Sequence, residues 1–120
     1  MAKILIVEDN EMNMRLFSDL LKSRQHTVIT CGESIQAMDM ILQNRPDIIL
    51  MDIQMPEISG LELTRLIRCN NAIKNTTIIA VSAFAMADDI QRIKDSGCTD
   101  YISKPIEINL FFETIDKYLH

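Results

Sequence analysis

Two adjacent acids, Glu8 and Asp9, come directly after the apolar run of residues 4–7. A third acid, Asp52, follows a second, largely apolar run at residues 47–51. Carboxylates at close range repel one another and raise each other's pKa, so a group of them needs a compensating charge. The pattern therefore indicates that a cation neutralises acids placed at the ends of buried segments.

These residue types are suited to phosphoryl transfer with a divalent cation. Mg²⁺ is commonly held by one or two carboxylates together with phosphate oxygens and water. We expect Asp9 and Asp52 to be direct ligands and Glu8 to act through water. A carboxylate can also be a nucleophile and form an aspartyl-phosphate. Lys104 and Ser82 could then pair with phosphoryl oxygens, because this reaction depends mainly on positioning and charge neutralisation.

Each of these residues also has a structural interpretation when it is taken alone. Asp9 or Asn10 could cap a helix that begins just after them. Asp52 precedes a proline-containing turn, where acids are common. Ser82 could cap the next helix, and Lys104 could be an ordinary surface lysine. Their shared position after apolar segments favours a site.

Five short segments rich in Ile and Val alternate with five helical patterns. Most of the segments lack polar alternation, which is typical of strands covered on both faces. We expect strands at residues 3–7, 27–30, 47–51, 77–82 and, more weakly, 100–103. We expect helices at residues 13–23, 33–44, 59–68, 87–97 and 109–119, the fourth of them closed by Gly97. Their apolar faces include Leu16, Phe17, Leu20, Leu21, Ile35, Met38, Ile41, Leu42, Leu63, Leu66, Ile67, Ile90, Ile93, Phe111, Ile115, Tyr118 and Leu119.

This alternation predicts the α/β class. Repeated β-α units build a parallel sheet with helices on both faces, and right-handed crossovers leave few topologies. The leading candidate is a doubly wound five-stranded parallel sheet of order 2-1-3-4-5, as in flavodoxin-like and CheY-like folds. Ligands of such sheets bind beyond the carboxyl ends of the strands. The fold would thus bring the acids, Ser82 and Lys104 to one edge.

Length, charge and cysteine content exclude several classes of protein. The 120 residues fit one domain, predicted to span 1–120. A formal net charge of −5 with no basic run argues against a nucleic-acid partner. Three scattered cysteines argue against a disulfide framework and favour a reducing compartment. No segment approaches the roughly 20 apolar residues of a membrane span, and no signal peptide is recognisable. We expect a cytoplasmic protein without membrane insertion.

Four stretches together resemble the receiver domain of two-component response regulators over essentially the whole chain. They are ILIVEDN, IILMDIQMPEISGLEL, IIAVSAFAM and YISKPI. The resemblance implies that Asp52 accepts a phosphoryl group from a histidine kinase or a histidine phosphotransfer protein. It implies that Glu8 and Asp9, with Asp52 and the backbone carbonyl of Gln54, hold Mg²⁺, for which Mn²⁺ could substitute.

The resemblance assigns further roles around the phosphoryl site. Ser82 would be the switch hydroxyl, Lys104 would pair with the phosphate, and Tyr101 would be the aromatic that responds to activation. The side chains of Gln54 and Phe84 occupy positions that tune dephosphorylation in the family. A cis peptide bond is implied between Lys104 and the following proline.

The resulting expectation is a phosphorylation-switched signalling module, and not an enzyme that turns over an external substrate. Its downstream protein target would bind the fourth helix, the fifth strand and the fifth helix. Within the family the resemblance is strongest to a single-domain regulator of cell division, which implies a role in cell-cycle control. Two alternatives stay open. The chain could be a receiver domain excised from a longer regulator, or a Mg²⁺-dependent phosphohydrolase, although Gln54 stands where such enzymes carry a second acid.

A flavin carrier of the same topology is a weaker alternative. A flavin phosphate would need a loop rich in Ser, Thr or Gly after the first strand. The segment EDNEMN at residues 8–13 is acidic instead and would repel the phosphate.

Overall fold

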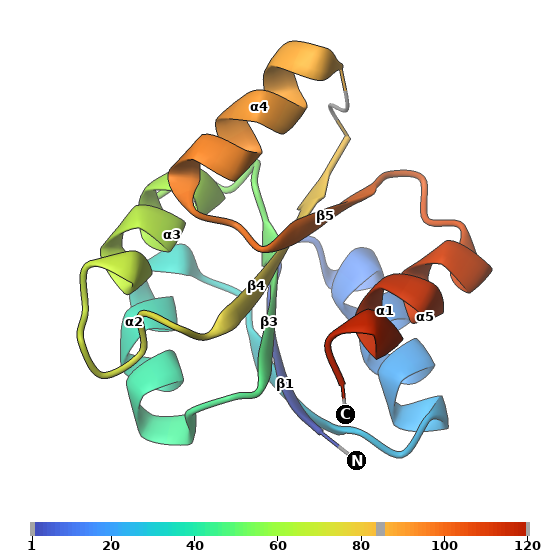
Figure 1. Cartoon of the computed structure of the whole chain (residues 1–120). Coiled ribbons are helices and arrows are strands. Elements are labelled where there is room, and N and C mark those ends of the chain that lie inside the picture. The colour runs from blue at the N-terminus through green and yellow to red at the C-terminus, as the bar shows by residue number, and fades with distance from the viewer. Residues whose placement is uncertain (1, 84–85, 120) are drawn as a thin grey trace.

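The computed structural model describes residues 2–83 and 86–119, and within them five strands alternate with five helices (Figure 1). All strand pairs are parallel, and the sheet order is β2-β1-β3-β4-β5, which confirms the predicted class and topology. The strands are β1 Lys3–Val7, β2 Thr27–Cys31, β3 Ile48–Asp52, β4 Thr77–Ser82 and β5 Asp100–Ser103. The helices are α1 Glu11–Ser23, α2 Ser34–Asn44, α3 Gly60–Arg68, α4 Ala87–Ser96 and α5 Ile108–Lys117. None of these described helices is long and apolar enough to span a membrane.

The sheet separates two layers of helices. In Figure 1, α1 and α5 cover one face, and α2, α3 and α4 lie on the other. Alternate residues of β1 point to opposite faces, so Ile4 and Ile6 join one apolar cluster while Leu5 and Val7 join the other. Every residue of β3 is buried. Continuous apolar runs therefore mark the strands that are covered on both sides, as predicted.

The structure decides two helix caps that the sequence left open. Helix α1 begins two residues earlier than expected, and Asn10, not Asp9, caps it by accepting a hydrogen bond from the Asn13 N–H at 3.0 Å. The N-cap of α4 is Met86, so Ser82 does not cap that helix. Gly97 closes α4 with a φ of 107°, as predicted, because glycine readily adopts this left-handed conformation.

Three of the residues predicted on apolar helix faces are exposed. Leu16, Ile35 and Leu66 keep 41%, 56% and 51% of their surface in contact with solvent, which corrects that part of the prediction. Successive residues on a helix diverge by about 100°. A neighbour such as Phe17, only 1% exposed, therefore takes the position over the sheet and leaves Leu16 at the margin.

Candidate functional site

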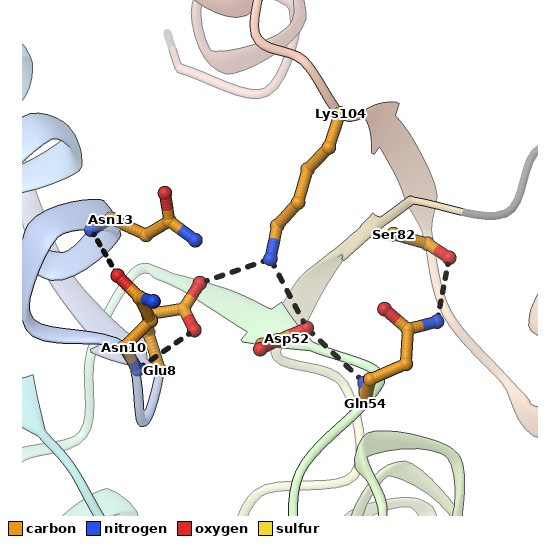
Figure 2. Close-up of polar contacts among 7 residues, drawn as sticks. All are labelled: Glu8, Asn10, Asn13, Asp52, Gln54, Ser82 and Lys104. Carbon is orange, nitrogen blue, oxygen red and sulfur yellow. Dashed lines mark hydrogen bonds and ion pairs between the residues drawn. The ribbon is translucent and has the colours of Figure 1, made fainter.

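The sheet register places four strand ends side by side. Val7 is paired with Met51, so Glu8 and Asp52, the next residues along β1 and β3, are neighbours. Asp52 in turn is paired with Val81, and Ser82 follows it at the end of β4. Lys104 comes directly after β5 and reaches over the edge toward the acids (Figure 2).

Three carboxylates meet at this edge. Each of Glu8, Asp9 and Asp52 offers a carboxylate oxygen, and these oxygens lie within 4.8 Å of one another. Glu8 is 1% exposed and Asp52 is 3% exposed, whereas Asp9 is exposed to solvent. Like charges so close and so poorly solvated are unfavourable without a cation. Hard oxygen ligands in this number suit a divalent ion such as Mg²⁺.

Lys104 compensates the buried charge only in part. Its Nζ lies 3.4 Å from Glu8 Oε1 and 3.6 Å from Asp52 Oδ1. Charge-assisted hydrogen bonds are usually about 2.7–2.9 Å long, so both contacts are loose. Burial, a hydrogen bond shared with Asp52 and the repulsion of that acid raise the pKa of Glu8 to about 7. The raised pKa shows that this edge, as it stands, disfavours a full negative charge on Glu8.

Backbone N–H groups fix the two buried acids. The Asn10 N–H donates to Glu8 Oε2 at 3.2 Å, and the Gln54 N–H donates to Asp52 Oδ1 at 3.2 Å. Because Asn10 also caps α1, the first acid is tied to the start of that helix. The side chain of Gln54 extends across the edge and donates from Nε2 to Ser82 Oγ at 3.2 Å (Figure 2).

Gly60 supports the backbone of Asp52, and sequence reasoning did not single it out. A Cβ added at Gly60 would lie 2.4 Å from the carbonyl oxygen of Asp52 and 2.9 Å from Ile53 Cα. The Gly60 N–H donates to the Ile53 carbonyl at 3.1 Å. The first residue of α3 must therefore be glycine for the helix to start this close to β3. A signal was present in the pair Ser59-Gly60, an N-cap followed by a residue without a side chain.

Tyr101, a residue named from the sequence, is not part of this cluster. Tyr101 is half-buried on β5 and lines a separate cavity of about 330 Å³ together with Pro105 and Leu110. Phe84 lies outside the described residues. The Lys104–Pro105 peptide bond is cis, as the family resemblance implies.

The chain matches the model of the response regulator receiver domain over residues 4–116. The chain belongs to this family. A receiver domain is a signalling module of two-component systems, and relatives of the same kind recur among curated proteins. The polar-differentiation response regulators DivK of Brucella anthropi and Brucella ovis are each 47% identical over 116 residues, which cover 97% of this chain and 94% of theirs.

Solved structures of receiver domains agree with the fold. The chemotaxis response regulator CheY4 of Vibrio cholerae has a TM-score of 0.93 at 26% identity, covering 99% of both chains. The receiver domain of the sensor histidine kinase PA1611 from Pseudomonas aeruginosa PAO1 has a TM-score of 0.89 at 31% identity, covering 98% of this chain and 96% of its own. That second structure holds a magnesium ion coordinated in its active-site cleft.

The structure thus brings together most of the residues that the sequence nominated. Glu8, Asp9, Asp52 and Lys104 form one charged cluster, and Ser82 joins it through Gln54. The arrangement offers a buried carboxylate with a cation beside it, and oxygen ligands for a divalent metal. Both features suit chemistry that depends on positioning and charge neutralisation.

Proposed function

We propose that this chain is a phosphorylation-switched signalling module that accepts a phosphoryl group on Asp52. One observation carries the proposal above all. The Asp52 carboxylate shares its edge of the sheet with two further acids within 4.8 Å and has the Lys104 ammonium at 3.6 Å. A carboxylate with an ammonium on one side and, on the other, acids that can hold a metal ion is an arrangement that suits phosphoryl acceptance.

The proposed reaction moves the phosphoryl group from a histidine of a partner protein. The N–P bond of the phosphohistidine breaks as an O–P bond forms to an Asp52 oxygen, and the departing imidazole takes up a proton from water. The Gln54 N–H, which donates to Asp52 Oδ1, holds the carboxylate in one orientation. Lys104 has a reach that suits pairing with a phosphoryl oxygen, since its Nζ already lies near Asp52.

We assign the metal site to Glu8, Asp9, Asp52 and the backbone carbonyl of Gln54. Asp9 and Asp52 would be direct ligands, and Glu8 would act through water. The ion, Mg²⁺ with Mn²⁺ as a substitute, would neutralise charge on the phosphoryl group when bound. The acidic cluster supports this assignment, because its oxygen atoms suit such an ion and Lys104 alone compensates it incompletely.

Phosphorylation of Asp52 would change the positions of Ser82 and Tyr101. Ser82 would donate to a phosphoryl oxygen, and the half-buried Tyr101 would change its position in response. The surface formed by α4, β5 and α5 would then bind a downstream protein. Such a switch requires contacts that differ between its two states.

The wider assignments follow from the relatives. We propose one receiver domain spanning residues 1–120, a sensor histidine kinase or histidine phosphotransfer protein as phosphoryl donor, and a cytoplasmic location. The similarity to DivK supports a role in cell-division control. The module would assist only its own phosphorylation and dephosphorylation. A receiver domain excised from a longer regulator would have the same site chemistry.

The test is labelling with acetyl phosphate and Mg²⁺, followed by intact mass. The wild-type protein is expected to gain one phosphoryl group, and Asp52→Asn to gain none. Asp39→Asn, the same change on the exposed face of α2, should label normally. Labelling of Asp52→Asn at another residue would refute the assignment. Many turnovers of a phosphomonoester by the wild-type protein would instead favour the phosphohydrolase alternative.

A further inference from the structure

Gln54 contacts both the proposed phosphoryl acceptor and the proposed switch hydroxyl. Its backbone N–H donates to Asp52 Oδ1, and its side-chain Nε2 donates to Ser82 Oγ, each at 3.2 Å. In Figure 2 the Ser82 hydroxyl is directed to the Gln54 amide and away from the Asp52 carboxylate. The hydrogen bond thus favours an orientation in which the hydroxyl points away from the acid that would carry a phosphoryl group.

The backbone on both sides of Gln54 is anchored, so the hydrogen bond between Gln54 and Ser82 starts from a fixed position. The Ile53 N–H donates to the Val81 carbonyl at 3.1 Å, which ties the turn after β3 to β4. Met55, the next residue along, is only 8% exposed and packs in the core cluster under α2 and α3. Gln54 is therefore fixed on both sides, and its amide is held close to the end of β4.

Space exists for the contact to open. Gln54 and Ser82 line a cavity of about 220 Å³ whose other walls include Ile93 and Arg92 of α4. An amide released from Ser82 could turn into this cavity without displacing the core. Breaking the hydrogen bond therefore removes one polar contact and requires little repacking.

We propose that the Gln54 amide is a positioning residue that stabilises the resting orientation of Ser82 and so lowers the affinity of the site for the phosphoryl group. The inference rests on the proposed function, in which Ser82 turns toward a phosphoryl oxygen at Asp52. A contact made in only one of two states shifts their equilibrium by its own free energy. Apparent affinity for a ligand of the other state falls in proportion.

The decisive variant is Gln54→Met, which keeps the length of the side chain and removes the side-chain donor that bonds to Ser82. The affinity for beryllofluoride with Mg²⁺, a mimic of the phosphoryl group, should rise about two- to fivefold, since one partly exposed hydrogen bond is lost from the resting state. The half-saturating beryllofluoride concentration can be followed by NMR of the backbone amides. Gln36→Met makes the same change on the exposed face of α2 and should leave that concentration unaltered.

A double-mutant cycle separates the proposed contact from a steric effect of the side chain. In a Ser82→Ala background, Gln54→Met should no longer change beryllofluoride affinity, whereas in a Ser82→Thr background, which keeps the hydroxyl, it should. An equal rise in beryllofluoride affinity in the Ser82→Ala and Ser82→Thr backgrounds would overturn the proposal. An unchanged affinity of Gln54→Met in the wild-type background would overturn it as well.

A second readout needs no metal or phosphoryl group. In the metal-free protein, the Gln54 side-chain NH₂ resonances should shift and exchange faster with water when Ser82 is replaced by alanine, and the Gln36 resonances should not. A failure of the proposed function would appear as no beryllofluoride binding in any variant, with this coupling still present. A failure of the inference would appear as normal beryllofluoride binding without coupling between Gln54 and Ser82.

Discussion

The two ends of the parallel sheet each hold a partly buried cation, and they compensate its charge in different ways. At the carboxyl ends, Lys104 lies 3.4 and 3.6 Å from the buried acids Glu8 and Asp52. At the amino ends, the guanidinium of Arg68 donates to four neutral acceptors among the described residues, at 2.6–3.2 Å. These acceptors are the carbonyl oxygens of Lys74, Thr76 and Gly97 and the hydroxyl of Thr99.

The two cations therefore differ in whether their surroundings balance their charge without a ligand. The planar guanidinium is well matched to several fixed acceptors, and the carbonyl groups around Arg68 gain a donor at good distance. The carboxyl end has more negative than positive charge, and burial, with the neighbouring Asp52 as the next cause, raises the pKa of Glu8. A cation or a change of protonation can alter the charge around Lys104, whereas the carbonyl and hydroxyl acceptors of Arg68 do not titrate.

The largest expected effect comes from the backbone contact under the acids. Gly60→Ala should lower the free energy of unfolding by about 3 kcal/mol, because overpacking against fixed backbone atoms displaces them. The new Cβ would lie 2.4 Å from the Asp52 carbonyl, so labelling of Asp52 should fall as well. Urea unfolding followed by circular dichroism measures the first effect and intact mass the second.

Gly32→Ala is the matched control for that variant. Gly32 lies at the same edge, but its added Cβ would be 4.0 Å from the nearest atom, the Glu8 carbonyl oxygen. Its stability should change by less than about 1 kcal/mol. Equal losses in the two variants would show that the carboxyl end is generally intolerant of side chains and that the contact at Gly60 is not special.

The comparison of Arg68 and Lys104 predicts that loss of Arg68 lowers stability without affecting phosphorylation of Asp52. Arg68→Ala should lower the free energy of unfolding by about 2 kcal/mol, because several backbone carbonyls lose their donor. The rate at which acetyl phosphate labels Asp52 should not change. Arg65→Ala, at an exposed position of the same helix, should leave both quantities near the wild-type values. A slower labelling rate in Arg68→Ala would contradict the separation.

Lys104→Ala should show the reverse pattern. The loss of stability should be smaller than in Arg68→Ala, because Glu8 can take up a proton when the ammonium is removed. Asp52 should still be labelled, but phosphorylation should no longer alter the binding of partner proteins. Pull-downs with beryllofluoride-loaded and unloaded protein measure this. A normal difference between the two pull-downs would count against the role of Lys104.

The pH dependence of stability tests the charge imbalance at the carboxyl end. With the pKa of Glu8 near 7 in the folded protein against 4.5 as its ordinary value, the folded state holds a proton that the unfolded chain releases. Stability should therefore fall as pH rises through this interval, by at most about 1.4 kcal/mol per pH unit. Glu8→Gln should remove this dependence of stability on pH, and Glu11→Gln, a change at an exposed acid nearby, should keep it.

Mg²⁺ should stabilise the wild-type protein more at pH 8 than at pH 6. A wild-type slope that survives in Glu8→Gln would show that another group is responsible.

The sequence was sufficient for the parts of the molecule that depend on periodicity. Apolar runs at strand length determined the five parallel strands, and their order placed the ends of β1 and β3 together. From there Glu8 and Asp52 could be expected to meet, because the carboxyl ends of parallel strands share one edge. Sequence pattern works here since it needs only the position of a residue along its strand.

Side-chain direction and close backbone approach could not be obtained in this way. The hydrogen bond from Gln54 to Ser82 depends on two rotamers that are brought together by β3 and β4. The need for Gly60 depends on how near α3 starts to β3. Arg68 reads as an ordinary helix-end arginine, and its acceptors come from segments that only the tertiary fold unites. In each case the missing information is three-dimensional and not local.

The smallest expected effect lies at the amino end, where His26 should give a pH dependence of opposite sign. The His26 Nδ1 accepts a hydrogen bond from the Ala2 N–H at 3.2 Å, and burial lowers the pKa of the imidazole below its ordinary value of 6.5. Protonation would put a hydrogen on the accepting nitrogen, so stability should be lost as pH falls below 6.5. The difference between the wild-type protein and His26→Gln should stay below about 1 kcal/mol, the net worth of one hydrogen bond. Urea unfolding of both proteins between pH 5 and pH 8, about the range in which an imidazole titrates, measures it. A wild-type protein that does not lose stability relative to His26→Gln as pH falls below 6.5 would contradict this role of His26.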